Sequence, residues 1–225
     1  TTATDGRNGG TGTIFMKSST QDYGELIVNG NNVSKLARPT IINSSFFTLS
    51  VLDNLTVANR SALLIDMPLV INSTEFVIGS SSALYPNANL SLPRVQNLTI
   101  NGAFELSGNY SFNDSMNVVI NSGGNLSHRT NSDVQMYVLN ITAVNFTIKE
   151  GGVINVSMRG YARNQGPGRG QSSDNGAGHG GHGGIATGKI GGTVYGSVTE
   201  PLTIGSGGHS SSDTGAGSGL VYLNI

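Results

Sequence analysis

The sequence predicts an all-β fold, a right-handed parallel β-helix (a solenoid) with a glycine-rich loop region near the C-terminus. A recurring strand pattern is the first observation behind this prediction. Six short segments place apolar residues at positions i and i+2, the spacing of a strand with one buried face. They are Leu26–Val28, Leu55–Val57, Phe76–Ile78, Leu98–Ile100, Val118–Ile120 and Phe146–Ile148.

The spacing of these segments is the second observation. Successive segments begin 29, 21, 22, 20 and 28 residues apart, with Gly and Asn in the turns between strands. Periods in the low twenties without helical spacing favour the coils of a parallel β-helix, and each long interval would hold an inserted loop. An antiparallel sandwich or jelly roll is the alternative, since it also has short strands separated by turns. Five segments are followed, six residues after their second apolar residue, by another large aliphatic: Leu63, Leu84, Leu106, Leu126 and Ile154.

We expect a single unit over residues 1–225. It would contain an opening coil (1–31), sequon-rich coils (32–155), a glycine-rich loop region (156–219) and a closing strand (220–225). Because the chain starts with Thr rather than Met, we expect a processed protein or part of a longer one.

Composition excludes several classes of protein. Charged residues make up 11% of the chain and the net charge is −1, so no basic patch indicates nucleic acid. No run approaches 18 consecutive apolar residues, so we expect no membrane span. The chain has no cysteine. A secreted chain without disulfides needs another source of stability, and stacked coils supply one.

Sequons of the form N-x-[ST] are unusually frequent between residues 32 and 155. With 24 Asn and 46 Ser or Thr in the chain, chance pairing would give roughly five, yet thirteen occur. A sequon accepts a glycan only in a secreted eukaryotic protein and at a surface position. The pattern therefore predicts a secreted, extracellular or cell-surface protein with covalent N-linked glycans; the alternative is a bacterial Asn-rich β-protein without sugar. The asparagines are Asn32, Asn43, Asn54, Asn59, Asn72, Asn89, Asn97, Asn109, Asn113, Asn125, Asn140, Asn145 and Asn155.

Several sequons fit the strand pattern. At Asn54, Asn97 and Asn145 the middle sequon residue is the inward apolar one, so the asparagine and its hydroxyl partner share the outer face. Asn54, Asn97 and Asn140 are each 43 residues apart, which predicts a sugar about every 10 Å along one face. The alternative is that stacked asparagines form hydrogen-bonded ladders at coil corners, as at Asn59 and Asn101, which explains the outward strand positions less well.

Glycine dominates the last third of the chain: residues 151–225 hold 22 of the 33 glycines. The motifs run Gly160-Tyr161 to Gly166-Pro167-Gly168, Gly176 to Gly184, Tyr195-Gly196, Gly205 to Gly208, and Gly215 to Gly219. They resemble the glycine-rich insert of secreted and cell-surface β-helix proteins of plants, protists and some bacteria, with the pattern GxGY…GPG, GxGHGGxGG, YG…P…GSGG and GxGxxxxI. This resemblance implies a right-handed β-helix in an extracellular setting and no catalytic residues. Ser218 and Leu220 stand where a longer glycine run is common.

The two ends of the chain carry a similar motif, a glycine cluster that leads into an apolar strand. No helical cap is evident at either end, so terminal coils would expose unpaired strand edges. We therefore expect head-to-tail self-association into a filament, with units either in tandem within one chain or as separate subunits. The predicted stacking ends are Thr13, Ile14 and Phe15, and Leu220, Val221, Tyr222 and Leu223.

Candidate chemistry is sparse, and we expect neither catalytic residues nor a cofactor. His179 and His182 are weak metal candidates without a neighbouring Cys or carboxylate, and a ring packed in a glycine loop is the alternative. Asp53 and Glu75 would lie on adjacent coils, but they are most simply strand flanks rather than the carboxylate pair of a glycosidase.

The sequence thus predicts a structural extracellular glycoprotein, a stacking subunit of a filament, surface hair or coat. A β-helical adhesin or carbohydrate-binding surface module is the alternative, and a polysaccharide lyase or hydrolase is a third. Tyrosines in the coils are scattered rather than aligned into a binding platform, which favours the structural role: Tyr23, Tyr85, Tyr110 and Tyr137.

Overall fold

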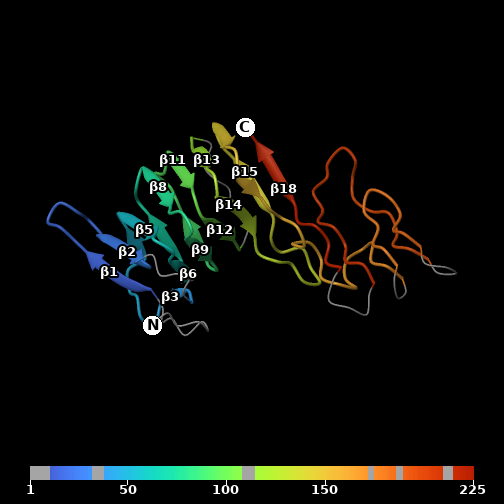
Figure 1. Cartoon of the computed structure of the whole chain (residues 1–225), viewed down its shortest axis with the longest axis horizontal. Helices are drawn as coiled ribbons and strands as arrows, with labels where there is room; N and C mark the ends of the chain where they lie inside the picture. Colours follow the sequence, from blue (N-terminus) through green and yellow to red (C-terminus); the bar gives the residue numbers. More distant parts are fainter. Residues whose placement is uncertain (1–10, 32–37, 108–114, 172–174, 186–189, 210–214) are drawn as a thin grey trace.

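The computed structural model describes residues 11–31, 38–107, 115–171, 175–185, 190–209 and 215–225. Every regular element in these ranges is a β-strand. The part of the chain described here therefore holds no long apolar helix of the kind that spans a bilayer. The molecule is elongated, with the strand pair β1 and β2 near one end and the glycine-rich region at the other (Figure 1).

The strands form four sheets. The largest has the order β1 (Gly12–Met16), β2 (Glu25–Asn29), β5 (Asn54–Ala58), β8 (Glu75–Ile78), β11 (Asn97–Ile100), β13 (Asn117–Ile120) and β16 (Asn145–Ile148). The six-stranded sheet has the order β3 (Thr40–Asn43), β6 (Ala62–Asp66), β9 (Ala83–Pro86), β12 (Ala103–Leu106), β14 (Asn125–His128) and β17 (Val153–Ile154). A three-stranded sheet joins β4 (Val51–Leu52), β7 (Leu69–Ile71) and β10 (Leu90–Ser91), and a two-stranded sheet joins β15 (Leu139–Thr142) and β18 (Val221–Asn224).

The chain visits these sheets in a fixed order. From the seven-stranded sheet it enters the six-stranded sheet, then the three-stranded sheet, and then returns. Three circuits follow this order: β2–β3–β4, β5–β6–β7 and β8–β9–β10. Two later circuits, β13–β14–β15 and β16–β17–β18, use the two-stranded sheet in the third position. The fold is thus all-β and built from parallel sheets in a repeating circuit.

The predicted strand repeat is confirmed as one in-register stack. All six predicted segments lie in the seven-stranded sheet, where Leu55 pairs with Leu26, and Leu98 pairs with Phe76 and Val118. Every pairing between named strands in the described ranges is parallel except that of β1 with β2. This pattern excludes the antiparallel sandwich.

The second apolar set also stacks, with one shift in register. Leu84 pairs with Leu63 and with Phe104, and Phe104 pairs with Leu126. Leu106 has the same offset in the sequence but lies two residues beyond this level, because the turn between β11 and β12 is two residues shorter than those of the neighbouring circuits. A shift of two residues keeps the same face of the strand, so Leu106 is also buried, one pair further along.

The core lies between the sheets and consists almost entirely of aliphatic side chains and two phenylalanines, Phe76 and Phe104. The third sheet was not foreseen. Its strands β4, β7 and β10 are only two or three residues long, too short to show an alternation in the sequence. Their inward residues nevertheless complete the core: Leu52, Leu69, Ile71 and Leu90.

The opening strand differs from the predicted opening coil. β1 pairs antiparallel with β2, whereas β18 pairs parallel with β15. Only eight residues connect β1 to β2, and a parallel crossover needs a dozen or more. The two glycine-led strands at the chain ends are therefore not equivalent copies of one motif.

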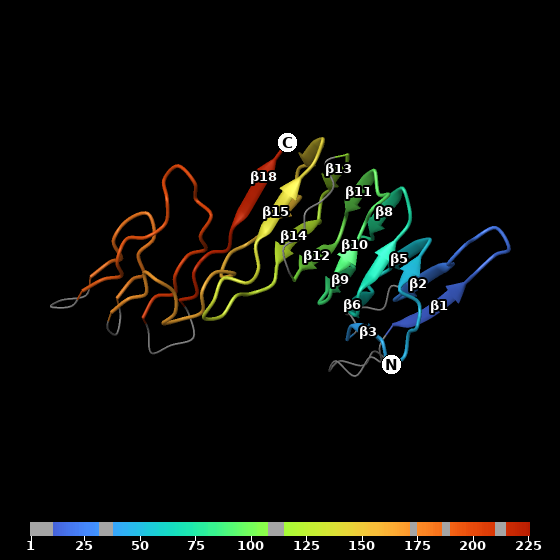
Figure 2. The ribbon, with the colours of Figure 1, turned by 180° about the vertical axis from the view of Figure 1, so that it is seen from behind.

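The glycine-rich region is inserted between β17 and β18, and β18 returns the chain to β15 (Figure 2). Backbone hydrogen bonds between glycines hold this region together: Gly160 N–H donates to Gly217 O at 2.7 Å and Gly178 N–H to Gly168 O at 2.7 Å. Among its described residues, the only β-pairing is an isolated bridge between Asn175 and His209. The described part of this region thus contains none of the sheets found in the rest of the molecule.

Candidate glycan-bearing row and strand edges

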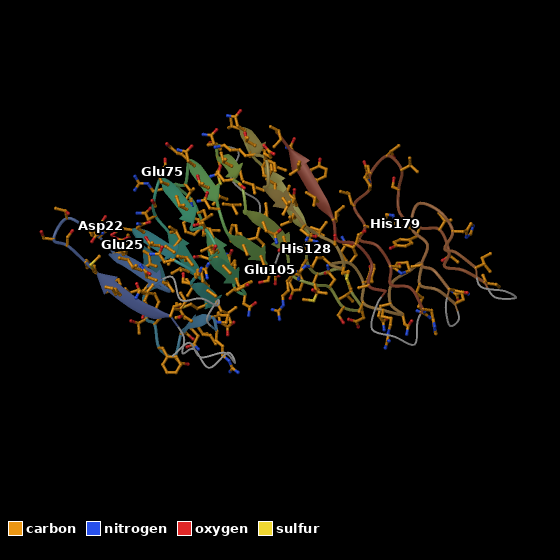
Figure 3. The ribbon with its side chains drawn as sticks, in the orientation of Figure 1. Asp22, Glu25, Glu75, Glu105, His128 and His179 are labelled. Atoms are coloured by element: carbon orange, nitrogen blue, oxygen red, sulfur yellow. The ribbon has the colours of Figure 1, made fainter. Side chains whose placement is uncertain are left out.

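The first residues of successive strands in the seven-stranded sheet form one outward row, called the asparagine row below. Pairing places Glu25 beside Asn54, and places Asn97 between Glu75 and Asn117. The next residue of each strand from β2 to β13 is a buried core side chain, so the row itself faces outward. Figure 3 labels two of its members, Glu25 and Glu75. The full row is Glu25, Asn54, Glu75, Asn97, Asn117 and Asn145.

Side-chain hydrogen bonds run along this row in one direction. Asn145 Nδ2 donates to Asn117 Oδ1 at 2.8 Å, and Asn117 Nδ2 donates to Asn97 Oδ1 at 3.0 Å. Asn97 Nδ2 then donates to Glu75 Oε1 at 2.5 Å, where a carboxylate ends the run because it only accepts. A separate bond joins Asn54 Nδ2 to Glu25 Oε1 at 3.0 Å. The ladder expected at coil corners is present there, where Asn121 Nδ2 donates to Asn101 Oδ1 at 2.7 Å. Contrary to the expectation, a ladder also runs along these outward strand positions.

The sequons of the row occupy alternate strands. Asn54, Asn97 and Asn145 belong to sequons, whereas Glu75 and Asn117, between them, do not. Strands in a sheet lie about 4.8 Å apart, so neighbouring sequon asparagines lie about 9.6 Å apart.

A ladder and an attached sugar are compatible at Asn97. Its oxygen accepts from Asn117 on one side, and its Nδ2 donates to Glu75 on the other. The Nδ2 hydrogen that bonds to Glu75 is therefore the one that points away from the carbonyl oxygen of Asn97. A secondary amide prefers the trans form, in which the substituent replaces the other hydrogen. Glycosylation would therefore leave in place the hydrogen that the ladder uses.

Asn140 does not lie on this row, contrary to the expectation from its 43-residue spacing. It sits on β15, in the two-stranded sheet. The connection between β14 and β15, residues 129–138, lengthens the circuit β13–β14–β15. The third sequon of the row is consequently Asn145, 48 residues after Asn97.

The remaining sequons divide by exposure. Side chains at four of them are exposed: Asn59, Asn89, Asn140 and Asn155. Asn43 and Asn72 are half-buried. Asn125 is the exception, because its Oδ1 is enclosed without a partner among the described residues and its sequon hydroxyl residue, Ser127, is buried. Three lie outside the described residues: Asn32, Asn109 and Asn113.

The predicted stacking ends are exposed strand edges. β1 carries Thr13, Ile14 and Phe15, all exposed, and lies at the edge of its sheet with β2 as its strand partner. β18 carries the half-buried Val221 and the exposed Tyr222 and Leu223, follows the half-buried Leu220, and pairs with β15. Within the described part of the chain, each edge strand therefore has one unpaired side, and each displays apolar side chains.

A groove of about 500 Å³ lies beside the β15–β18 sheet. Its floor includes Asn140 and Tyr222, which are direct neighbours in the strand register. Its opposite wall is the 199–202 loop. Gln135 fixes that wall, because its Nε2 donates to Leu202 O at 2.9 Å and its Oε1 accepts from Ile204 N–H at 3.0 Å.

The two candidate metal-binding histidines lie in the glycine-rich region. His179 Nε2 is 3.1 Å from both Thr203 O and Thr203 Oγ1, and its ring meets the Tyr195 ring edge-on at 4.7 Å. His182 is exposed. The described residues contain no group of three or more His, Cys, Asp or Glu placed to hold a metal. The environment of His179 corresponds to a ring packed in a glycine loop.

The candidate carboxylate pair has structural partners. Asp53 Oδ2 accepts from Gly24 N–H at 2.7 Å and Tyr23 N–H at 2.8 Å, and these bonds lower the pKa of Asp53. Glu75 accepts from Asn97 in the asparagine row. Both carboxylates therefore serve to join neighbouring strands.

His128 is a buried residue that the sequence reasoning missed. It lies where the strands meet the glycine-rich region (Figure 3). Nδ1 is 2.8 Å from Arg129 O, which only accepts, so Nδ1 carries the proton; Nε2 then accepts from Leu220 N–H at 3.3 Å. Burial lowers the pKa of His128. A single histidine in a short strand leaves no pattern in the sequence.

Comparisons with known proteins returned no match: no protein-family model matches the chain, and no curated protein or solved structure is significantly similar to it.

Proposed function

We propose that this chain is a right-handed parallel β-helix that serves as a structural, N-glycosylated subunit of an extracellular filament, surface hair or coat. Each circuit of strands would be one coil of the helix. Glycans would cover the sides of the coils, and the exposed edge strands would join one unit to the next.

The observation that carries this proposal is the alternation in the asparagine row. Sequons at Asn54, Asn97 and Asn145 occupy every second strand of one outward face, and a row with a sugar on every strand would crowd glycans at about 4.8 Å. At Asn97 the ladder uses the amide hydrogen that a trans glycosidic amide keeps. The row can therefore hold sugars without losing its hydrogen bonds.

The exposed edges support the second part of the proposal. An open edge strand with apolar side chains is a template for pairing with another chain, and β1 and β18 both fit that description. Their surfaces differ, so contact between them would be heterologous. A heterologous contact that does not close into a ring produces a filament.

The test uses protein secreted from a eukaryotic host. Intact-glycopeptide mass spectrometry should find sugar on Asn54, Asn97 and Asn145, and sedimentation velocity should show growth into long oligomers with rising concentration. Ile14→Asp on the β1 edge should abolish growth, while Val77→Asp, at an exposed apolar position within the same sheet, should leave it intact. Bare asparagines at all three positions, or monomers at every concentration, would overturn the proposal.

A carbohydrate-binding surface module is the second candidate, and the groove beside β15–β18 favours it. Its volume of about 500 Å³ falls in the range of small-molecule sites, and it has an exposed tyrosine, Tyr222, on its floor. Saturable binding of soluble saccharides by a protein that stays monomeric would select this function.

A further inference from the structure

We propose that the groove beside β15–β18 is the seat of the chain's own glycan on Asn140, whose first N-acetylhexosamine packs against Tyr222. This inference rests on the proposed N-glycosylation. It goes further by giving one glycan a fixed place in the structure and by giving the groove a definite occupant.

The first argument is the strand register. Asn140 on β15 is the direct partner of Tyr222 on β18 in a parallel pair. Leu139 and Ile141, on either side of Asn140, are both buried, so Asn140 points outward. Side chains at paired positions lie on the same face about 5 Å apart. A sugar attached to Nδ2 of Asn140 therefore starts next to the tyrosine ring.

The second argument is the chemistry of the ring. Tyr222 is 48% exposed on this face. An aromatic face carries partial negative charge, and the C–H groups on one side of a pyranose ring carry partial positive charge. The sugar therefore covers apolar ring surface that otherwise faces water.

The third argument is that the groove is already formed and is mixed in character. Gln135 bonds to both Leu202 O and Ile204 N–H, which fixes the far wall. That wall offers Pro201 and Leu202 for packing, and Thr199 and Glu200 as hydrogen-bonding partners. A preformed site that combines apolar surface with a few polar groups is typical of small-ligand binding.

The covalent step is ordinary sequon chemistry. Asn140 Nδ2 loses one proton and forms a bond to C1 of the sugar, while a diphosphate-activated oligosaccharide donor loses its diphosphate. Thr142 supplies the sequon hydroxyl. The tether is short, so the local concentration of the first sugar at Tyr222 is high from the moment it is attached.

The experiment compares two sites on the same folded, secreted protein. Asn89 is an exposed sequon asparagine that does not line the groove, so it serves as the internal control. A glycan amidase is added under native conditions, and release is followed at each site by peptide mass spectrometry. We expect release at Asn140 to be at least about tenfold slower than at Asn89, because the amidase must reach the first sugar, which the ring and the groove shield.

Two variants assign the protection to the ring. Tyr222→Ala should raise the release rate at Asn140 to that at Asn89, and Tyr222→Phe, which keeps the ring, should retain the protection. Leu202→Ala, on the opposite wall, should give an intermediate rate and keeps the test available if Tyr222→Ala fails to fold. Release at Asn89 should be the same in all of these proteins.

The outcomes separate this inference from the function on which it rests. If Asn140 is occupied but released as fast as Asn89 in the wild-type chain, the packing is wrong and the glycoprotein proposal stands. If Asn140 is bare while the asparagine row is occupied, the inference also fails, and the groove is open to a soluble saccharide. If no sequon carries sugar, both proposals fail.

Discussion

The β-strand circuits and the glycine-rich region maintain their order by opposite means. In the circuits, side chains of the same kind stack in register and fill a continuous apolar core. In the glycine-rich region, backbone packs directly on backbone, as where Gly192 N–H donates to Gly176 O at 3.0 Å. The first region depends on side chains being present, and the second depends on their being absent.

The comparison explains why one chain without cysteine contains both regions. A stack of parallel strands gains stability from each added circuit, so it can support an insertion that has little core of its own. The glycine-rich region attaches to the stack at both ends, through β17 and β18. It also contacts the stack at His128 and through Gln135.

Loss of an aromatic side chain from the core should have the largest effect on stability. Phe104 is fully buried between Leu84 and Leu126 in the strand stack. Phe104→Ala should lower the free energy of unfolding by about 3–5 kcal/mol, because it removes buried surface and leaves a cavity. Urea unfolding measures this change. Val77→Ala, at an exposed position of β8 in the seven-stranded sheet, should change stability by less than about 0.5 kcal/mol. If the two substitutions lowered the free energy of unfolding equally, side-chain stacking would not be what stabilises the circuits.

Addition of a methyl group within the glycine-rich region should have the second largest effect on stability. A Cβ on Gly192 would overlap the carbonyl oxygen of Gly168, whereas a Cβ on Gly181 would meet nothing within 4 Å. Gly192→Ala should therefore cost about 1–3 kcal/mol by overpacking, and Gly181→Ala should be close to neutral. Hydrogen exchange should locate the loosening within residues 160–219. Unchanged protection there in Gly192→Ala would argue against the backbone packing.

The His128 contact between the two regions should be sensitive to acid. Because burial lowers its folded pKa below the ordinary value of 6.5, the folded state disfavours the proton. Its contribution to stability is full above the unfolded pKa and is lost as pH falls through the folded pKa. Arg159, which is paired with Glu105 at 2.7 Å, carries a positive charge near His128 and also lowers the pKa of His128.

Protonation would also turn Nε2 from an acceptor into a donor facing Leu220 N–H. The free energy of unfolding of the wild-type chain, measured with urea, should therefore fall as the pH drops below about 6.5. His128→Gln should remove this dependence, whereas the exposed control His182→Gln should keep it. His128→Ala should cost about 1–3 kcal/mol at neutral pH, because it removes the buried imidazole and its hydrogen bond to the half-buried Leu220.

Interruption of the asparagine row should have the smallest effect on stability. Asn117→Ala removes the central side chain of the ladder and with it the bonds to Asn97 and Asn145. We expect a loss of about 1 kcal/mol in unglycosylated protein, because exposed hydrogen bonds exchange with water. Gln96→Ala, an exposed neighbour, should change stability by less than about 0.5 kcal/mol. A loss of several kcal/mol would show that the row, rather than the core, holds the sheet.

The sequence predicted what repeats locally and missed what depends on distant segments. The seven-stranded sheet was foreseen because each of its central strands carries its own apolar pair, such as Leu98 and Ile100. The antiparallel β1 was missed because strand direction follows from the length of the connection rather than from composition. Phe104, rather than Leu106, lies level with Leu84 and Leu126 for a similar reason, a turn shortened by two residues.

In the candidate site, too, the sequence predicted the local features and missed those that depend on distant segments. Outward placement of Asn54, Asn97 and Asn145 could be predicted from alternation within each sequon. Assignment of Asn140 to the row failed because a constant spacing presumed circuits of equal length. The groove beside Tyr222 and the contact of His128 with Leu220 join segments more than 80 residues apart, and no pattern in a single sequence records such contacts.

Electron microscopy of the native, glycosylated material tests the central claim most directly, at a resolution that shows subunit boundaries and sugar density. We predict a filament of these units stacked end to end through the β1 and β18 edges, with sugar on alternate strands of the asparagine row. Discrete monomers with bare asparagines at Asn54, Asn97 and Asn145 would contradict it.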